Sequence, residues 1–235
     1  MKIEYLSWDS EFFGKKIGKI NCCTSDEMEF AKLLTEAQET GYQLLYIFDQ
    51  DSLYFDQHIL DTYNGRLVDT KVVYSLTIND LELKETIAKE YNSQNLTDEF
   101  ETLAYLSGNL SRFRLDKGFD PHDFYRLYKI WMTKSLSKEI ADKVFVVSEN
   151  EKIAGMVTLK INNEIGTIGL FAVSESVQGR GYGKNLINAC SNELISKGIF
   201  QIEVPTQMEN LKACSFYEKC GFNIKSITNI YHFWL

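Results

Sequence analysis

The chain has 235 residues, of which 44% are hydrophobic and 25% are charged, and its formal net charge is −8. This length and hydrophobic content are enough for a packed globular core. The negative charge argues against a broad nucleic-acid or acidic-membrane surface, so an anionic ligand needs a local cluster of Lys and Arg. No metal site is indicated, because the five cysteines contain no CxxC and the three histidines are scattered singly.

The amino terminus and the cysteines indicate a cellular compartment. Glu4 and Asp9 interrupt the start of the chain, which has no apolar run followed by small residues and so does not resemble a secretory signal. The adjacent Cys22-Cys23 pair does not make a disulfide framework. No segment is apolar enough over sufficient length to predict a membrane span. We therefore expect a reduced, cytoplasmic protein.

Strands and helices alternate in the first part of the chain. The hydrophobic patterns and caps predict strands at 2–6, 43–48 and 66–78, a short helical segment around Phe12 and Phe13, and helices at 26–40 and 52–63. The inward positions of the helix at 26–40 are expected to be Met28, Ala31, Leu34 and Ala37.

Residues 79–98 are charged and polar, and we place a domain junction there. The expected division is a smaller, truncated domain over 1–95 and a second domain over 96–235. The junction is expected to be partly helical, because Leu83, Ile87 and Tyr91 fall at four-residue steps.

The second part begins with a predicted helix at 121–137. Its apolar stripe comprises Phe124, Leu127, Tyr128, Trp131 and Leu136. Clean alternation then predicts an antiparallel hairpin with strands at 144–147 and 153–161. From residue 165 onward the predicted order is strand, helix, strand, helix, strand.

The two parts of the chain share one predicted order of elements, which we call the internal echo. A helix that ends at Gly41 is followed by a strand, a helix, Gly65 and a strand, and the same order runs from Gly198 to Gly221 and beyond. The first part is therefore a candidate degenerate copy of the second. The alternative is that any α/β chain shows such an order by chance.

The most informative stretch is the glycine-rich turn near residue 180. Apolar residues alternate up to Ala172 and then follow helical spacing from Leu186, so the turn joins a strand to a helix. Its glycines permit positive φ, and the first N–H groups of the new helix are unpaired. With Arg180 and Lys184 beside those donors, the turn is suited to a phosphate or pyrophosphate.

Two common phosphate loops do not fit this turn. A Walker A loop needs Gly and Ser or Thr where this chain has Gln178 and Asn185. The dinucleotide fingerprint fails because its third glycine is missing. What remains is the pattern Gln-x-x-Gly-x-Gly, which resembles the acetyl-CoA pyrophosphate loop of the GNAT-type N-acetyltransferases. A tight helix start that binds no ligand is the alternative.

A second motif favours the same family. The pattern N-x-x-A-x-x-F-Y-x-x-x-G-F resembles the helix and strand that complete the acetyl-CoA site in these enzymes, and it comprises Asn210, Ala213, Phe216, Tyr217, Gly221 and Phe222. The resemblance implies an α/β GNAT fold, with a mixed central sheet flanked by helices. It also implies acetyl-CoA contacts from Phe171, Ala172, Val173, Gln178, Gly179, Arg180, Gly181, Tyr182, Gly183, Lys184 and Asn210.

Further stretches narrow the resemblance. Residues 6–14, 111–114 and 206–207 and the helix around Trp131 resemble the dTDP-fucosamine acetyltransferase family, which acetylates a dTDP-4-amino-4,6-dideoxyhexose. The likeness covers nearly the whole chain. It implies acetyl-CoA as co-substrate, a small-molecule amine (a dTDP-amino sugar) as partner, no metal and no nucleic acid.

The resemblance also implies catalytic roles. Tyr217 is the expected general acid, because its hydroxyl, with an ordinary pKa of about 10, is protonated at neutral pH and can protonate a leaving thiolate. The alternative is a buried Tyr with a structural role. Glu203 is either a base or a structurally paired residue, so the base stays unassigned. Arg112 and Arg114 either bind a nucleotide pyrophosphate or lie on the surface around Phe113.

Other functions stay open. The chain is alternatively a GNAT enzyme for another amine, such as a protein amino terminus or an aminoglycoside, or a non-catalytic acyl-CoA-binding module. The sequence does not determine the sugar stereochemistry, whether the acetylated amino group is at position 3 or 4, the acyl chain length or whether the chain forms a homodimer.

Overall fold

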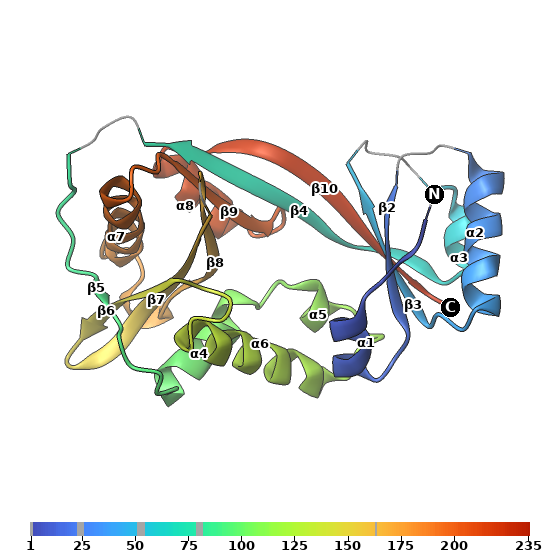
Figure 1. Ribbon diagram of the computed structural model, residues 1–235, viewed down its shortest axis with the longest axis horizontal. Coiled ribbons are helices and arrows are strands. Elements are labelled where there is room, and N and C mark those ends of the chain that lie inside the picture. Colours follow the sequence, from blue (N-terminus) through green and yellow to red (C-terminus); the bar gives the residue numbers. More distant parts are fainter. Residues whose placement is uncertain (1, 23–25, 51–54, 79–81, 163) are drawn as a thin grey trace.

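One sheet of ten strands with helices on both faces organises residues 2–22, 26–50, 55–78, 82–162 and 164–235, the parts that the computed structural model describes. The strands are β1 (Glu4–Tyr5), β2 (Ile17–Cys22), β3 (Leu44–Asp49), β4 (Gly65–Thr77), β5 (Lys89–Glu90), β6 (Lys143–Glu149), β7 (Lys152–Ile161), β8 (Gly166–Val173), β9 (Gln201–Gln207) and β10 (Asn223–Trp234). The helices are α1 (Ser7–Phe13), α2 (Glu27–Glu39), α3 (Gln57–Thr62), α4 (Asp98–Ser107), α5 (Arg112–Leu115), α6 (Pro121–Leu136), the 3₁₀ helix η1 (Glu175–Val177), α7 (Tyr182–Ser196) and α8 (Leu211–Lys219). The strand order is β1-β2-β3-β10-β4-β9-β8-β7-β6-β5 (Figure 1).

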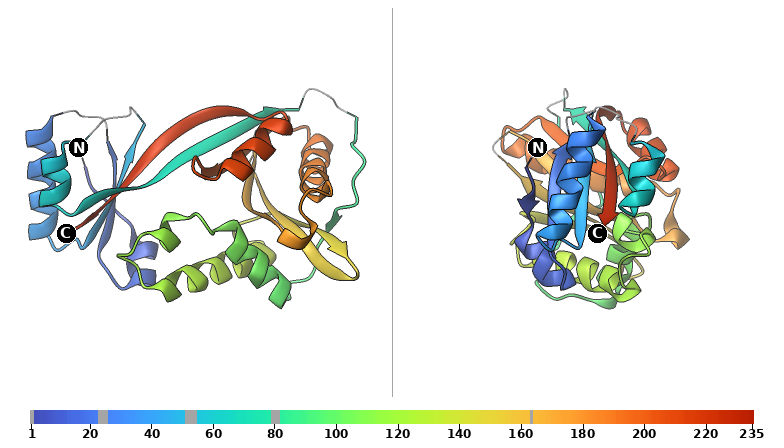
Figure 2. Two further views of the ribbon diagram at one scale, coloured as in Figure 1. Left: turned by 180° about the vertical axis from the view of Figure 1, so that it is seen from behind. Right: turned by 90° about the vertical axis from the view of Figure 1, so that its right-hand side faces the viewer.

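The two parts of the chain exchange strands in the middle of this sheet. Strand β10 lies between β3 and β4 and is antiparallel to both, and β4 also pairs with β9. In Figure 1, β4 and β10 form the long twisted pair that joins the two lobes, and Figure 2 shows the same crossing from behind. The predicted division between 1–95 and 96–235 therefore separates strands that are neighbours in one sheet.

The internal echo of the sequence has a counterpart in this order. The units α2-β3-α3-β4 and α7-β9-α8-β10 run through the same elements. Each has a parallel strand beside its first strand, β2 beside β3 and β8 beside β9. The last strand of each unit then pairs with the first strand of the other, so the sheet is nearly symmetric about the β10-β4 pair.

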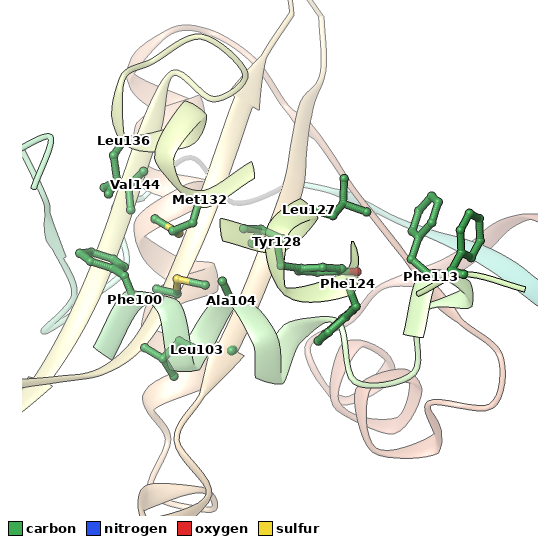
Figure 3. Close-up of a cluster of buried hydrophobic side chains, with 14 of the residues drawn as sticks. Phe100, Leu103, Ala104, Phe113, Phe124, Leu127, Tyr128, Met132, Leu136 and Val144 are labelled. Carbon is green, nitrogen blue, oxygen red and sulfur yellow. The ribbon is translucent and has the colours of Figure 1, made fainter. Parts of the chain in front are cut away.

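Alternation along the strands divides the core between the two faces of the sheet. On β3, Leu45 and Ile47 pack in the cluster beneath α2 and α3, whereas Leu44 and Tyr46 belong to the cluster with α1, α4, α5 and α6. On β6, Phe145 packs with α7 on the opposite face from α4 and α6. Figure 3 shows the cluster between α4, α6 and the sheet, with Phe100, Leu103, Ala104, Phe124, Leu127, Tyr128 and Met132 at its centre.

A buried carboxylate fixes β10 to the segment between α5 and α6. Asp116 has a fully buried side chain and accepts hydrogen bonds from the ring N–H of Trp234 (2.9 Å) and the backbone N–H of Gly118 (3.0 Å). It also lies 2.5 Å from His232 Nδ1. Burial lowers the pKa of His232 to about 4, so the ring is neutral at pH 7 and donates its Nδ1–H. Helix α5, which precedes Asp116, is thereby held against the sheet.

The local predictions of the second part are confirmed. The helix predicted at 121–137 is α6, which begins with Pro121 after an Asp120 cap that accepts from the His122 N–H (2.8 Å). The predicted hairpin is β6-β7, whose turn residues Asn150 and Glu151 both have positive φ. Such a pair of left-handed residues matches the twist of the flanking strands.

Other predictions were wrong. Met28 is 85% exposed, and the residues that α2 buries are Phe30, Leu34 and Ala37. Residues 82–97 contain no helix, and Leu83 and Ile87 are exposed, because the backbone there is bound in an extended form along α7. Of the helix predicted at 52–63, the structure confirms Gln57–Thr62 (α3), which begins after an Asp56 cap, and residues 51–54 lie outside the described residues. Strand β2 and helix α4 were not predicted.

Candidate active site

The glycine loop joins β8 to α7, as the change in hydrophobic period predicted. Gly179 and Gly181 both have a φ of +81°, a left-handed conformation that other residues disfavour. Gly181 is also the N-cap of α7, and no side chain caps the helix there. The first N–H groups of α7 are therefore available to an anionic ligand.

The third glycine lets two helices approach closely. A Cβ built on Gly183 would lie 2.9 Å from the ring of Phe216 in α8. The start of α7 thus lies against α8, whose N-cap is Asn210. The Asn210 Oδ1 accepts from the Ala213 N–H (3.2 Å), which leaves the Nδ2 donors for a ligand.

Strands β8 and β9 diverge beside this loop. They pair only at 166–167 with 202–203 and separate toward their carboxyl ends. The Ser174 N–H donates to a β7 carbonyl oxygen (2.8 Å). Since peptide groups alternate in direction along a strand, the N–H groups of Phe171 and Val173 point to the open side, toward β9. Among the described residues, the open wedge therefore presents backbone N–H donors of β8 that have no partner strand.

A cavity of about 1070 Å³ extends from the glycine loop through this wedge to the N-terminal part of the chain. It is lined by most of the predicted cofactor residues, namely Phe171, Ala172, Val173, Gln178, Gly179, Gly181, Tyr182, Gly183, Lys184 and Asn210. Gln178 also donates from Nε2 to the Val173 carbonyl (3.0 Å), so its side chain ties the loop to the end of β8.

Tyr217, a residue of α8, lies on the wall of the same cavity. Its ring is 4% exposed and packs against Phe171, Phe216 and Tyr74, with centroids 5.4 to 6.0 Å apart. Burial raises its pKa above the ordinary value, so the hydroxyl stays protonated at neutral pH. No residue in the described part of the chain accepts a hydrogen bond from it. A buried hydroxyl that faces a cavity without a partner is suited to donate a proton to a ligand.

Arg112 lines the far end of the cavity, where the N-terminal part contributes Trp8, Asp9 and Phe48. Its guanidinium lies over the ring of Tyr46 (5.0 Å) and that of Phe48 (5.6 Å). Its Nε is buried and has no hydrogen-bond partner among the described residues. Burial lowers the pKa of Arg112 from its ordinary value. The arginine therefore retains donor capacity for a ligand.

Asp69 and Lys71 reach the same end of the cavity from β4. Asp69 is 9% exposed and its Oδ1 has no hydrogen-bond partner in the described part of the chain. Burial raises its pKa to about 6. Ile230 of β10 is paired with Phe48 of β3 on one side and with Asp69 of β4 on the other. Residues paired directly across strands point to the same face of the sheet, so Phe48 and Asp69 both lie on the face that carries α5. This end of the cavity thus combines aromatic rings with donors and an acceptor.

Two predicted arginines do not line the cavity. Arg180 forms an ion pair with Glu149 (2.6 Å). Arg114 binds the side chain of Asn109 and lies over the ring of Phe124 (5.1 Å). Glu203, which the sequence left open as a base, pairs with Lys225 at 2.5 Å and is also outside the cavity.

Sequence reasoning missed the contributions of Asp69, Lys71 and Phe48. The local signal for Asp69 and Lys71 is that these two charged residues are two apart in the strand that ends at 77, which places both on one face. Phe48 has no such signal. Which face meets the cavity depends on the exchange of β10 into the sheet, and no local pattern predicts that exchange.

In the part of the chain that the structure describes, no three His, Cys, Asp or Glu side chains are grouped as metal ligands would be. None of the described helices is both long and apolar enough to span a membrane.

Comparison with known proteins agrees with this geometry. The model of the Acetyltransferase (GNAT) family matches residues 108–222. The chain is 30% identical over 126 residues to the uncharacterized N-acetyltransferase YvbK of Bacillus subtilis, covering 51% of this chain and 80% of that one. It is 24% identical over 235 residues to a dTDP-fucosamine acetyltransferase of Escherichia coli, covering 99% of this chain and 96% of that one.

A solved structure has the same fold over nearly the whole chain. The GCN5-related N-acetyltransferase from Sphaerobacter thermophilus superposes with a TM-score of 0.62, covering 98% of this chain and 75% of its own, at 15% identity. At this identity the likeness concerns the fold, which includes the N-terminal part as well as the segment that the family model matches.

Proposed function

Because this chain belongs to the GNAT acetyltransferase family and is therefore an N-acetyltransferase, we propose that it acetylates the amino group of a nucleotide-linked amino-deoxy sugar of the dTDP-4-amino-4,6-dideoxyhexose type. The observation that carries the proposal is the likeness to dTDP-fucosamine acetyltransferase, which extends over 99% of this chain and so includes the N-terminal part. That part supplies one end of the cavity. We further propose that the protein acts in the cytoplasm, since Cys190, Cys214 and Cys220 are free thiols.

The residues at the glycine loop fit acetyl-CoA. The uncapped start of α7 and the side chain of Lys184 suit a diphosphate, and the Asn210 Nδ2 group and the free amides of β8 suit an amide-containing arm. Several such contacts are needed, because micromolar affinity corresponds to about 8 kcal/mol and one charge-assisted hydrogen bond contributes only about 1.5 to 3 kcal/mol. When bound, acetyl-CoA supplies an acetyl group activated as a thioester.

In the proposed reaction both substrates occupy the cavity together. The N–H groups of Phe171 and Val173 hold the acyl oxygen, which polarises the carbonyl. The amine nitrogen attacks the carbonyl carbon, so a C–N bond forms and the C–S bond breaks. Tyr217 gives its hydroxyl proton to the departing sulfur, the amine proton passes to water, and Tyr217 then takes a proton back from water, so the enzyme returns to its starting state. No base is assigned, because Glu203 is paired with Lys225 outside the cavity.

The far end of the cavity is proposed to hold the remainder of the acceptor. Trp8 and Phe48 offer aromatic surfaces for a planar ring, and Arg112 offers donors for phosphate or carbonyl oxygens. A protein amino terminus or an aminoglycoside is the alternative acceptor, and the charges at this end do not exclude it, because Asp9 and Asp69 line the cavity beside Arg112 and Lys71.

The test is a panel of acceptors assayed for thiol release. With acetyl-CoA, we expect turnover of dTDP-4-amino-4,6-dideoxyhexoses and at least tenfold lower kcat/KM for 3-amino isomers, aminoglycosides and peptides. Comparable activity on peptides or aminoglycosides would overturn the sugar assignment, and a lack of heat on titration with acetyl-CoA would overturn the cofactor assignment.

A pair of arginine variants tests the acceptor end. Arg112→Ala should raise KM for the nucleotide sugar about tenfold or more, because it removes a charge-assisted hydrogen-bond donor from the cavity. The dissociation constant of acetyl-CoA should stay within twofold. Arg114→Ala is the matched control, since Arg114 is two residues away and outside the cavity. Equal effects of the two variants, or equal loss for both substrates, would contradict the assignment of Arg112.

A further inference from the structure

Residues 82–88, here called the connector, precede β5 and run along α7, and they pair with no strand among the described residues. Over residues 84–87 the connector is extended, and Figure 1 shows it descending beside α7 toward β5. Asparagine side chains of α7 hydrogen-bond its backbone in place of a neighbouring strand. A side-chain amide can do this because it carries the same donor and acceptor as a peptide group.

The bonds form a ladder along one face of α7. The Lys84 N–H donates to Asn192 Oδ1 (2.9 Å), and Asn192 Nδ2 donates to the Lys84 carbonyl (2.8 Å). Asn188 Nδ2 donates to the Glu85 carbonyl (2.9 Å). The Ile87 N–H donates to the Oδ1 of Asn185 (2.9 Å). These asparagines fall at i, i+3 and i+7, the spacing of one helix face.

Asn185 connects this ladder to the glycine loop. The Gly181 carbonyl accepts two hydrogen bonds from Asn185, one from its backbone N–H (3.1 Å) and a second from its side-chain Nδ2 (3.0 Å). The backbone carbonyl of Asn185 accepts from the Thr86 hydroxyl (2.7 Å), and its side-chain Oδ1 accepts from Ile87 as described above. One side chain therefore bridges the connector and the N-cap residue of α7. The far member of the ladder, Asn192, contacts the connector alone.

The loop needs such a constraint. Gly179 and Gly181 have positive φ, and glycine has more backbone conformational freedom than other residues. No side chain caps α7 at Gly181. A loop that must be ordered by its ligand binds that ligand more weakly, because the ordering entropy is lost on binding. Fixing the Gly181 carbonyl orients the peptide that begins α7 before any ligand arrives.

We propose that Asn185, held by the connector at Thr86 and Ile87, is a positioning residue that preorganises the pyrophosphate loop for acetyl-CoA. The connector is thereby part of the cofactor site although it does not line the cavity. This inference rests on the loop binding the acetyl-CoA diphosphate, as proposed above.

The experiment compares Asn185→Ala with Asn192→Ala. Each variant removes an asparagine that bonds the connector, but only Asn185 contacts Gly181. Asn185→Ala should raise the dissociation constant and KM of acetyl-CoA about fivefold to twentyfold, with kcat and the acceptor KM within twofold. Asn192→Ala should leave all of these values within twofold, even where it lowers the melting temperature equally. Thr86→Val should shift acetyl-CoA affinity in the same direction as Asn185→Ala by a smaller factor.

Amide hydrogen exchange of the ligand-free protein gives a readout that does not depend on the cofactor assignment. The amides of residues 181–184 should exchange several-fold faster in Asn185→Ala than in wild type or Asn192→Ala. Equal effects of the two Asn variants on exchange and affinity would overturn the inference, as would the absence of any effect. Failure of wild type to bind acetyl-CoA would instead overturn the cofactor assignment, and unchanged exchange in Asn185→Ala would still refute the positioning role separately.

Discussion

Replacing Tyr217 by Phe is expected to lower kcat by a factor of about 10² to 10⁴, the usual contribution of a positioned general acid. The variant keeps the ring that packs against Phe171, Phe216 and Tyr74 and removes only the hydroxyl on the cavity wall. Affinity for acetyl-CoA should therefore stay within a few-fold. Steady-state kinetics together with calorimetric titration measure both quantities.

Tyr74→Phe is the matched control for this prediction. Tyr74 lies in the same aromatic cluster, with its ring 5.9 Å from that of Tyr217, but its hydroxyl donates to Glu218 (2.9 Å). Its loss should reduce stability by about 1 kcal/mol and leave kcat within a few-fold. Wild-type turnover in Tyr217→Phe, or an equal loss in both variants, would remove Tyr217 from the mechanism.

The second large effect is expected at Asp69. Its pKa is raised from 3.8 to about 6, mainly by burial, so the native protein carries an energetic cost whenever this carboxyl is ionised. Below pH 4 this cost is absent, because the Asp69 carboxyl is protonated in both the folded and the unfolded chain. As the pH rises to about 6, the unfolded chain loses the proton before the folded chain does, so the free energy of unfolding decreases. Above about pH 6 the decrease is complete. Asp69→Asn should therefore stabilise the protein by about 1 to 3 kcal/mol at pH 8, and less at pH 5.

Asp69→Asn should also weaken binding of the acceptor substrate. The Asp69 Oδ1 has no hydrogen-bond partner among the described residues and lines the cavity, so its cost is offset only when a ligand donates to it. We expect acceptor KM to rise about tenfold or more in Asp69→Asn, with acetyl-CoA binding unchanged. Asp69→Asn is thus expected to give a more stable enzyme that binds its acceptor less well. This trade-off is typical of a buried binding residue that is ionised without a hydrogen-bond partner.

Urea denaturation between pH 5 and pH 8 measures the free energy of unfolding. Steady-state kinetics with varied acceptor concentration measure the acceptor KM. Glu203→Gln on the adjacent strand is a suitable control, because Glu203 already pairs with Lys225 and its replacement should not stabilise the protein. A destabilised Asp69→Asn, or a stability difference that does not shrink toward pH 5, would refute the burial argument.

The glycine-loop end of the cavity could be predicted because its signals are local. A change of hydrophobic period located the loop, and the spacing from Asn210 to Phe222 located the second motif. The other end could not be predicted, since Asp69, Phe48 and Trp8 meet only after β10 enters between β3 and β4. Arg112 was a candidate because guanidinium suits phosphate, but the sequence did not distinguish it from Arg114, which lies outside the cavity.

The errors have similar causes. The apolar steps at Leu83 and Ile87 suggested a helix, but asparagines from α7 bind that backbone in an extended form. In α2, Phe30 rather than Met28 faces the sheet, because the bulkier ring stacks on Phe55 and meets Phe233 edge-on. Both outcomes depend on neighbours far away in the sequence, which a local pattern does not contain.

The central position of β10 has a consequence for biosynthesis. Strands β3 and β4 share β10 as a neighbour, and β10 is residues 223–234, so during translation neither strand can complete its hydrogen bonds until almost all of the preceding chain has left the ribosome. Two exposed strand edges must therefore be protected while synthesis continues. The nascent protein is expected to depend on chaperones during this interval more than a chain whose halves fold one after the other.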